Sequence, residues 1–244
     1  MKKFIRAILS VIVGLVVLAI VGVVGAALLT NAAVKKAVER AGTRTLDVPV
    51  HIEKAKASLL SGLATLQKME VANPEGYEGP LLMTLRTVDV AADSGSLLRD
   101  TMLIHEMRLD GMEVFVEQNG LQNNLYEVIE PLRRPHEPTG KSLVIDKLTI
   151  DNIVVHVAMP SLTGQSQGKE LRIAPITMTD LGRHEPMDTT LLISKVVLAV
   201  AAGVAEEGGG ILPQETIGEI SGVLDKAIDI GRIIFGGGKK SEDK

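Results

Sequence analysis

The first pattern along the chain is a long apolar stretch close to its start. From Ile8 to Leu29 every residue is apolar or small except Ser10, which makes 22 residues. A helix of that length spans about 33 Å, enough to cross the hydrocarbon core of a bilayer. The apolar region of a signal peptide is shorter, although cleavage near Asn31 stays an alternative. The pattern predicts a transmembrane anchor over residues 1–30, with its apolar positions including Ile8, Leu15, Leu18 and Leu29.

The next segment, residues 31–45, is predicted to be a juxtamembrane helix and linker. Its apolar residues recur at helical spacing, namely Ala33, Val34, Ala37, Val38 and Ala41. Gly42 stands where a glycine would end a helix.

From residue 46 the apolar and polar positions alternate with a period of two, which is typical of strands. Gly, Pro, Asn and Asp lie between most of the alternating runs, as turns require. A β domain is therefore expected over residues 46–180, with runs at Val48–Ile52, Leu63–Ala72, Leu81–Ala91, Met102–Leu109, Met112–Glu117, Leu143–Ile150, Ile153–Ala158 and Glu170–Met178.

An internal repeat organises this domain. Residues 102–116 match residues 143–157 in residue type at an offset of 41. Each copy holds a dipeptide that favours tight turns, Asp110-Gly111 and Asp151-Asn152, and Asp-Gly is a strong hairpin signal. The repeat therefore predicts two hairpins within a curved antiparallel meander.

Within the runs the apolar positions shift phase, as between Ile104 and Met107, which predicts β-bulges that bend the sheet. A sheet with one aliphatic face must bury that face on a second layer, a helix or a ligand. Two interpretations stay open: a closed sandwich-like core, and a half-open, taco-like groove for acyl chains. The residues expected to line the groove are Leu66, Val71, Leu109, Met112, Val114, Val116, Ile150, Ile153, Val155 and Val157.

Helical spacing returns at two places. One helix is expected at Leu121–Glu130, and amphipathic helices are expected over residues 188–235. The latter include an apolar run at Leu191–Ala205 and a stripe from Ile217 to Ile234, which would pack on the core or dock on a membrane or partner. Residues 236–244 form a polar tail.

Composition removes several classes of protein. No cysteine is present, which excludes disulfides and thiolate metal sites. Aromatic residues make up 2% of the chain, and beyond Arg6 there are 23 basic against 30 acidic residues, a net charge of −7. A nucleic-acid-binding module needs a basic face and stacking rings, so no nucleic-acid partner is expected.

Catalytic patterns are weak. The five histidines form no metal-ligand pair. A Gly-x-Ser-x-Gly match at Ser166 lacks the preceding buried strand and the following helix of a nucleophile elbow. The sequence therefore predicts no enzymatic activity, no cofactor and no metal.

Several short motifs over residues 1–180 resemble the AsmA-like family, bacterial relatives of the chorein-type bridge-like lipid-transfer proteins. The motifs are Leu46-Asp-Val-Pro-Val50, Ser61-Gly62-Leu63, Met69-Glu-Val-Ala-Asn-Pro-Glu-Gly-Tyr77, Ser96-Leu-Leu-Arg-Asp100, Ile104-His-Glu-Met-Arg-Leu-Asp-Gly111, and Val114-Phe-Val-Glu117 followed by Asn124-Leu125. The chain also resembles membrane-anchored late-embryogenesis-type β-sandwich proteins, though the repeated turn Asp fits AsmA better.

The AsmA resemblance implies a single-pass protein of the bacterial inner membrane, with most of the chain in the periplasm. It implies a role in phospholipid transport or outer-membrane assembly, with membrane phospholipid as ligand and envelope proteins or a second copy as partners. A non-enzymatic scaffold with a closed core is the alternative.

Topology gives the first test. Lys2, Lys3 and Arg6 precede the apolar stretch and favour a cytoplasmic N-terminus, with residues 31–244 exported. Protease added to intact spheroplasts is expected to digest the C-terminal domain. Complete protection of that domain would contradict the assigned orientation.

Overall fold

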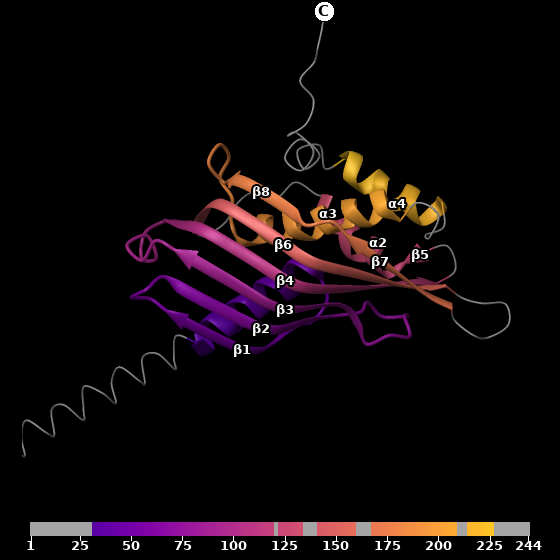
Figure 1. Cartoon of the computed structure of the whole chain (residues 1–244), viewed down its shortest axis with the longest axis horizontal. Helices are drawn as coiled ribbons and strands as arrows, with labels where there is room; N and C mark the ends of the chain where they lie inside the picture. The colour runs from indigo at the N-terminus through magenta and orange to yellow at the C-terminus, as the bar shows by residue number, and fades with distance from the viewer. Residues whose placement is uncertain (1–30, 120–121, 134–140, 160–166, 209–213, 227–244) are drawn as a thin grey trace, which may run out of the picture.

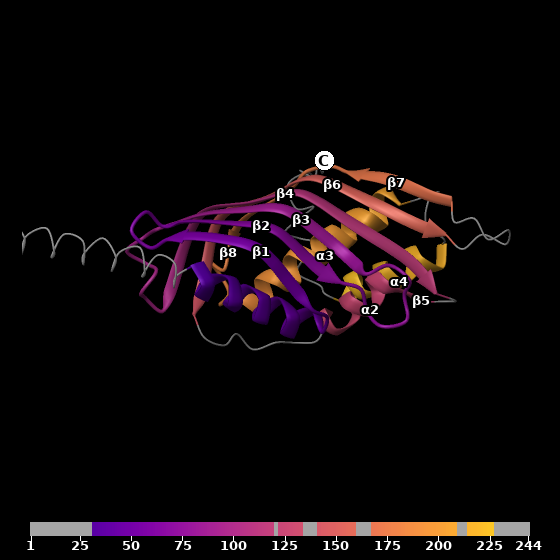
Figure 2. The ribbon, with the colours of Figure 1, turned by 90° about the horizontal axis from the view of Figure 1, so that it is seen from below.

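The computed structural model describes residues 31–119, 122–133, 141–159, 167–208 and 214–226. They form one curved, open β-sheet with helices gathered on one of its faces (Figures 1 and 2). The predictions that fall on residues 1–30 and 227–244, including the anchor and the polar tail, lie outside the described residues.

The sheet has the order β1-β2-β3-β4-β6-β7, with β5 paired to β4 and β8 paired to β6. The predicted mainly β fold is confirmed, as one open, mostly antiparallel sheet. The predicted antiparallel meander is interrupted where β4 and β6 pair in parallel. The strands are β1 (Val50–Ser58), β2 (Leu63–Ala72), β3 (Leu81–Ala92), β4 (Thr101–Asn119), β5 (Gln122–Asn123), β6 (Ser142–Met159), β7 (Gln167–Ile173) and β8 (Ile176–Leu181). The helices are residues 31–46, α2 (Asn124–Ile129), the short 3₁₀ helix η1 (Glu130–Arg133), α3 (Thr189–Glu207) and α4 (Gln214–Lys226).

The two predicted hairpins are wrong. β4 and β6 run through Asp110-Gly111 and Asp151-Asn152 without turning, as single strands of 19 and 18 residues. The two strands pair in parallel, and each residue of β4 lies beside the residue 41 positions later, as Leu109 lies beside Ile150. The repeat therefore reflects two neighbouring strands: residues 41 positions apart lie side by side in the sheet and have similar surroundings.

At one level of the sheet, every long strand places two consecutive residues on the outer face. Apolar rows that face inward flank this level on both sides, for example Leu85 with Met112 and Val88 with Leu109. We name this level the phase-shift row; it consists of Glu53-Lys54, Gln67-Lys68, Arg86-Thr87, Asp110-Gly111, Asp151-Asn152 and, between β7 and β8, Ala174-Pro175.

The backbone of the phase-shift row explains the dipeptides. Lys68, Gly111 and Asn152 have φ angles of 51°, 71° and 54°, in the left-handed region that Gly and Asn adopt most readily. A left-handed residue lets a strand skip one position of its alternation, as in a β-bulge. The predicted phase shift between Ile104 and Met107 is present, since the pairing of β3 with β4 shifts register there. The Asp-Gly pair makes a further shift in place of the predicted turn.

The helix formed by residues 31–46 covers the free edge of β1. Three of its side-chain oxygens accept hydrogen bonds from β1 amides: Asn31 Oδ1 from Ala57 at 2.7 Å, Glu39 Oε1 from Ile52 at 2.9 Å and Thr43 Oγ1 from Val50 at 3.0 Å. The helix thus satisfies backbone groups that would otherwise offer an edge for aggregation.

The prediction that Gly42 ends this helix is wrong, because the helix continues through residue 46. A Cβ at Gly42 would lie 2.9 Å from Cγ2 of Val50. Gly42 is therefore needed for the close approach of the helix to β1.

Of the predicted amphipathic C-terminal helices, α4 buries Ile220 and Val223 and exposes Gly218 and Gly222. The prediction is wrong for α3, in which six consecutive residues, 197–202, are buried. Because α3 lies between the sheet and the other helices, with contacts to β6, β7, α2 and α4, it has little polar face.

Gly111 gives a test of the phase-shift row. Gly111→Val forces a β-branched residue into left-handed backbone, which is expected to lower the free energy of unfolding by about 1–3 kcal/mol. Gly168→Val on β7 is the matched control, because a Cβ there meets nothing within 4 Å; its effect should stay within about 0.5 kcal/mol. Thermal or urea unfolding measures both, and equal destabilisation would contradict the role of Gly111.

Candidate functional site

The ten residues predicted to line a groove lie together on the inner face of the sheet. They occupy adjacent rows, in which Val71, Met83, Val114 and Val155 follow one another across four strands. All ten belong to the buried core, and the most exposed of them, Leu66, is 8% exposed. The ten residues therefore share the inner face, as the alternation in the sequence predicts, and in the structure this face is covered.

Helix α3 covers the part of this face formed by β6 and β7. Gly203 lets it come close to β7, since a Cβ at that position would lie 2.7 Å from Cγ2 of Ile173. Within the described residues α3 is the one helix long and apolar enough to cross a membrane, with a mean hydropathy of 1.7 and half of that window buried. The cover of the apolar face is thus itself unusually apolar.

A polar junction closes one end of the sheet, where the β2–β3 turn, the end of β4 and the start of α2 meet. Asn124, fully buried, accepts hydrogen bonds from the amides of Glu117 and Leu125, both at 2.9 Å. Its Nδ2 donates to Asn73 Oδ1 at 2.8 Å and to the Phe115 carbonyl at 2.7 Å. One amide side chain therefore fixes three segments of the chain.

Glu117 and Asn73 complete this junction. Glu117 Oε1 accepts hydrogen bonds from the Gly79 amide at 3.0 Å and from Asn73 Nδ2 at 3.1 Å. Tyr77 adds a hydrogen bond from its hydroxyl to Glu127 Oε1 at 2.7 Å. Two of the motifs that carry the AsmA resemblance meet here, Met69–Tyr77 and Val114–Glu117 followed by Asn124-Leu125. These contacts between distant segments were not predicted from the sequence.

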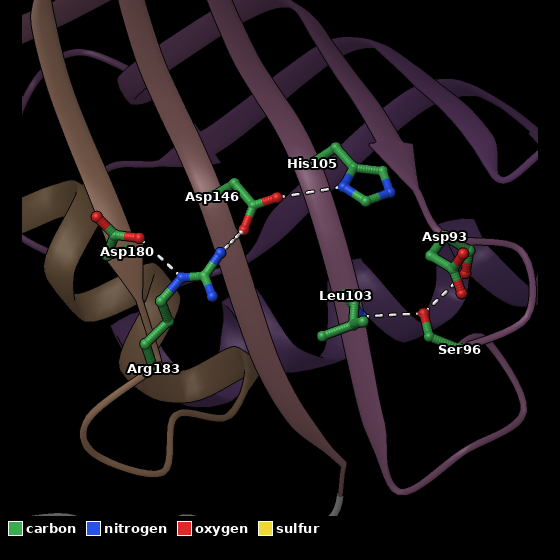
Figure 3. Close-up of polar contacts among 7 residues, drawn as sticks. All are labelled: Asp93, Ser96, Leu103, His105, Asp146, Asp180 and Arg183. Atoms are coloured by element: carbon green, nitrogen blue, oxygen red, sulfur yellow. Dashed lines mark hydrogen bonds and ion pairs between the residues drawn. The ribbon is translucent and has the colours of Figure 1, made fainter.

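At the opposite end, the loop between β3 and β4 is held by Ser96, which is fully buried (Figure 3). The Ser96 hydroxyl donates to the Asp93 carbonyl at 2.7 Å and accepts from the Leu103 amide at 2.9 Å. The Arg99 amide donates to the Ser96 carbonyl at 2.9 Å. The Ser96-Leu-Leu-Arg-Asp100 motif thus builds a compact, fixed loop.

The outer face near this loop carries a chain of charged residues (Figure 3). His105 Nδ1 lies 3.2 Å from Asp146 Oδ2, Arg183 bonds the other oxygen of Asp146, and Arg183 Nε lies 2.7 Å from Asp180. The hydrogen bond with His105, and secondly the Arg183 guanidinium, lower the pKa of Asp146. These side chains are exposed and paired with one another, the usual arrangement of a solvated charged face.

A hollow of about 490 Å³ lies over the phase-shift row on the outer face. Its cations face acids: Lys68 lies 2.7 Å from Glu53, Arg86 lies 3.6 Å from Asp110, and Arg172 lies 3.0 Å from Glu170. Glu70 and Glu113 also line the hollow, so each of these cations is paired and none is left over to attract an anionic ligand. In the described part of the chain, no group of three or more His, Cys, Asp or Glu side chains could hold a metal ion.

Comparison of the chain with protein-family models, curated proteins and solved structures gives no match.

The junction gives the second structural test. Asn124→Ala removes four hydrogen bonds and leaves buried backbone groups without partners, which is expected to cost about 2–3 kcal/mol of unfolding free energy. Thr65→Ala is the control, because its hydroxyl bonds Asp89 in an exposed position and should contribute less than about 0.5 kcal/mol. Urea unfolding followed by circular dichroism measures both. A loss at Asn124 no larger than at Thr65 would show that the junction does not stabilise the sheet.

Proposed function

We propose that this protein is a non-enzymatic, AsmA-like protein of the bacterial inner membrane that holds lipid acyl chains on the apolar face of its sheet. Residues 1–30 anchor it, the described domain lies in the periplasm, and it serves envelope lipid transport or outer-membrane assembly. One observation carries the proposal: the apolar face over β6 and β7 is covered by α3, a helix apolar enough for a membrane. An acyl chain that takes the place of α3 on the sheet would bring no polar group into contact with the apolar face.

The exchange is reasonable in energetic terms. The apolar rows continue across the strands without a charged side chain, as at Leu85, Met112 and Ile153. Each methylene that a lipid buries there contributes about 0.8 kcal/mol, so one acyl chain offsets much of the contact area that α3 gives up. The AsmA resemblance supports the same ligand.

A scaffold with a closed core is the second candidate, and the burial of the apolar face favours it. Val114, Val155 and Ile150 are fully buried beneath the helices. In this case α3 never leaves the sheet, and the protein acts through its surface alone.

A disulfide between α3 and β7 separates the two candidates. A Cβ at Gly203 lies 3.9 Å from Cβ of Ile173, within the 3.5–4.5 Å range that disulfides require, and the chain contains no other cysteine. If lipid needs the displacement of α3, the oxidised Gly203→Cys/Ile173→Cys protein should carry far less phospholipid per mole than its reduced form. Native mass spectrometry of detergent-extracted protein provides the measurement.

The controls are the two single-cysteine variants, which should carry the same lipid with and without oxidant. Lipid around the anchor is common to both states of the double variant, so the difference reports on the sheet. Equal lipid in the locked and reduced proteins would contradict a displaceable cover. Absence of phospholipid from both states and from the unaltered protein would favour the scaffold.

A further inference from the structure

The large apolar side chains that the described residues expose all lie at one end of the sheet. Leu59 and Leu60 belong to the turn between β1 and β2, Leu63 to the start of β2, Leu98 to the loop between β3 and β4, and Leu103 to the start of β4. Leu60 is 94% exposed and Leu98 is 89% exposed. Single exposed leucines are ordinary, but a group confined to one end marks an interaction surface.

The turn and the loop form one surface. The Ala92 amide donates to the Gly62 carbonyl at 2.8 Å, and Leu63 pairs with Ala91. Figure 1 shows the β1–β2 turn and the β3–β4 loop beside each other at the same end of the sheet. We name this surface the leucine tip; its residues are Leu59, Leu60, Leu63 and Leu98.

The tip is held in shape by its own backbone. Gly62 has a φ of 68°, which closes the β1–β2 turn at little steric cost. In the other loop the buried Ser96 hydroxyl bonds both sides of the segment that carries Leu98. Rigid loops that present leucines to solvent lose little conformational entropy when the leucines become buried.

The position of the tip relative to the predicted anchor indicates which surface the leucines contact. Asn31 Oδ1 accepts a hydrogen bond from the Ala57 amide at 2.7 Å, at the end of β1 that leads into the tip. The predicted membrane span ends at Leu29, and two residues of chain reach at most about 7 Å. A span that lies in a bilayer therefore brings the tip to the surface of the same bilayer.

We propose that the leucine tip inserts into the outer leaflet of the bilayer that holds the anchor, so that the sheet stands on the membrane at this end. The proposal rests on the membrane anchor of the proposed function. The exposed cations around the tip are Lys56, Arg99 and Lys141, and the acids are Asp89, Asp93 and Asp100. Because these charges nearly balance, the apolar side chains provide the attraction, and insertion depends little on salt or on anionic lipid.

The absence of cysteine from the chain permits a direct test. The full chain carrying Leu60→Cys is labelled with an environment-sensitive nitrobenzoxadiazole dye and reconstituted into phosphatidylcholine vesicles. Its emission should shift to the blue and be quenched by lipids that carry a nitroxide close to the head group. Glu75→Cys, exposed in the β2–β3 turn at the other end of the sheet, is the matched control and should show neither effect.

A second variant excludes insertion of the dye by itself. Leu59→Ser and Leu98→Ser, added to the Leu60→Cys protein, should diminish both the blue shift and the quenching while the melting temperature stays unchanged. If the label at position 60 keeps its shift without these leucines, the dye alone inserts and the proposal is overturned.

Flotation with the vesicles at alkaline pH reports separately on the anchor. A protein that floats, but whose label at position 60 behaves like the label at position 75, retains its anchor and refutes insertion of the tip. A protein that fails to float refutes the anchor and the tip together. Disulfide-linked dimers of the unlabelled Leu60→Cys protein, together with a label at position 60 that lipid does not quench, would assign the tip to contact with a second copy and would also overturn the proposal.

Discussion

Strands as long as β4, with 19 residues, can keep one apolar face only if the alternation of the side chains is reset along their length. A sheet that curves over a layer of helices cannot continue an unbroken two-residue period, because bending places successive residues out of phase with the core. The reset has to occur at the same level in every strand, since the residues on either side of it are paired across the sheet. The phase-shift row meets this constraint, with left-handed residues at Lys68, Gly111 and Asn152.

The helices follow from the same constraint. A sheet with a continuous aliphatic face and open edges is unstable in water unless both are covered. The helix of residues 31–46 covers the β1 edge through side-chain oxygens of Asn31, Glu39 and Thr43. The parallel pairing of β4 with β6 requires a crossover, and α2 begins this crossover at the buried Asn124. Helix α3 then fills the space that remains over the apolar rows.

The sequence indicated the inner face correctly, because side-chain alternation is a local property of the chain. It misplaced the hairpins, because Asp110-Gly111 has the same local chemistry in a tight turn and in a left-handed bulge. The choice between the two depends on pairing with residues 41 positions away. The offset of the repeat equals the register of this pairing, but the repeat alone does not show that the two copies pair. A cover by the C-terminal helices was one of two alternatives, but the contact between Gly203 and Ile173 that brings α3 onto β7 depends on residues far apart in the chain and had no local signal. The tip had a signal, Ser-Leu-Leu at Ser58–Leu60 and again at Ser96–Leu98, but only the fold brings the two copies together.

The two ends of the sheet are built differently, and the difference bears on how a cover could move. At the tip end, the residue before the α3 cap is tied to the sheet, because the Met187 carbonyl accepts a hydrogen bond from the Leu143 amide of β6 at 2.7 Å. Farther along, α3 meets β7 at Gly203 through van der Waals contact with Ile173. Separating the apolar contact leaves no buried polar group unpaired, whereas separating Met187 from Leu143 breaks a backbone hydrogen bond. A displacement of α3 would therefore pivot at the end with the leucine tip and open the apolar face from the end with the polar junction.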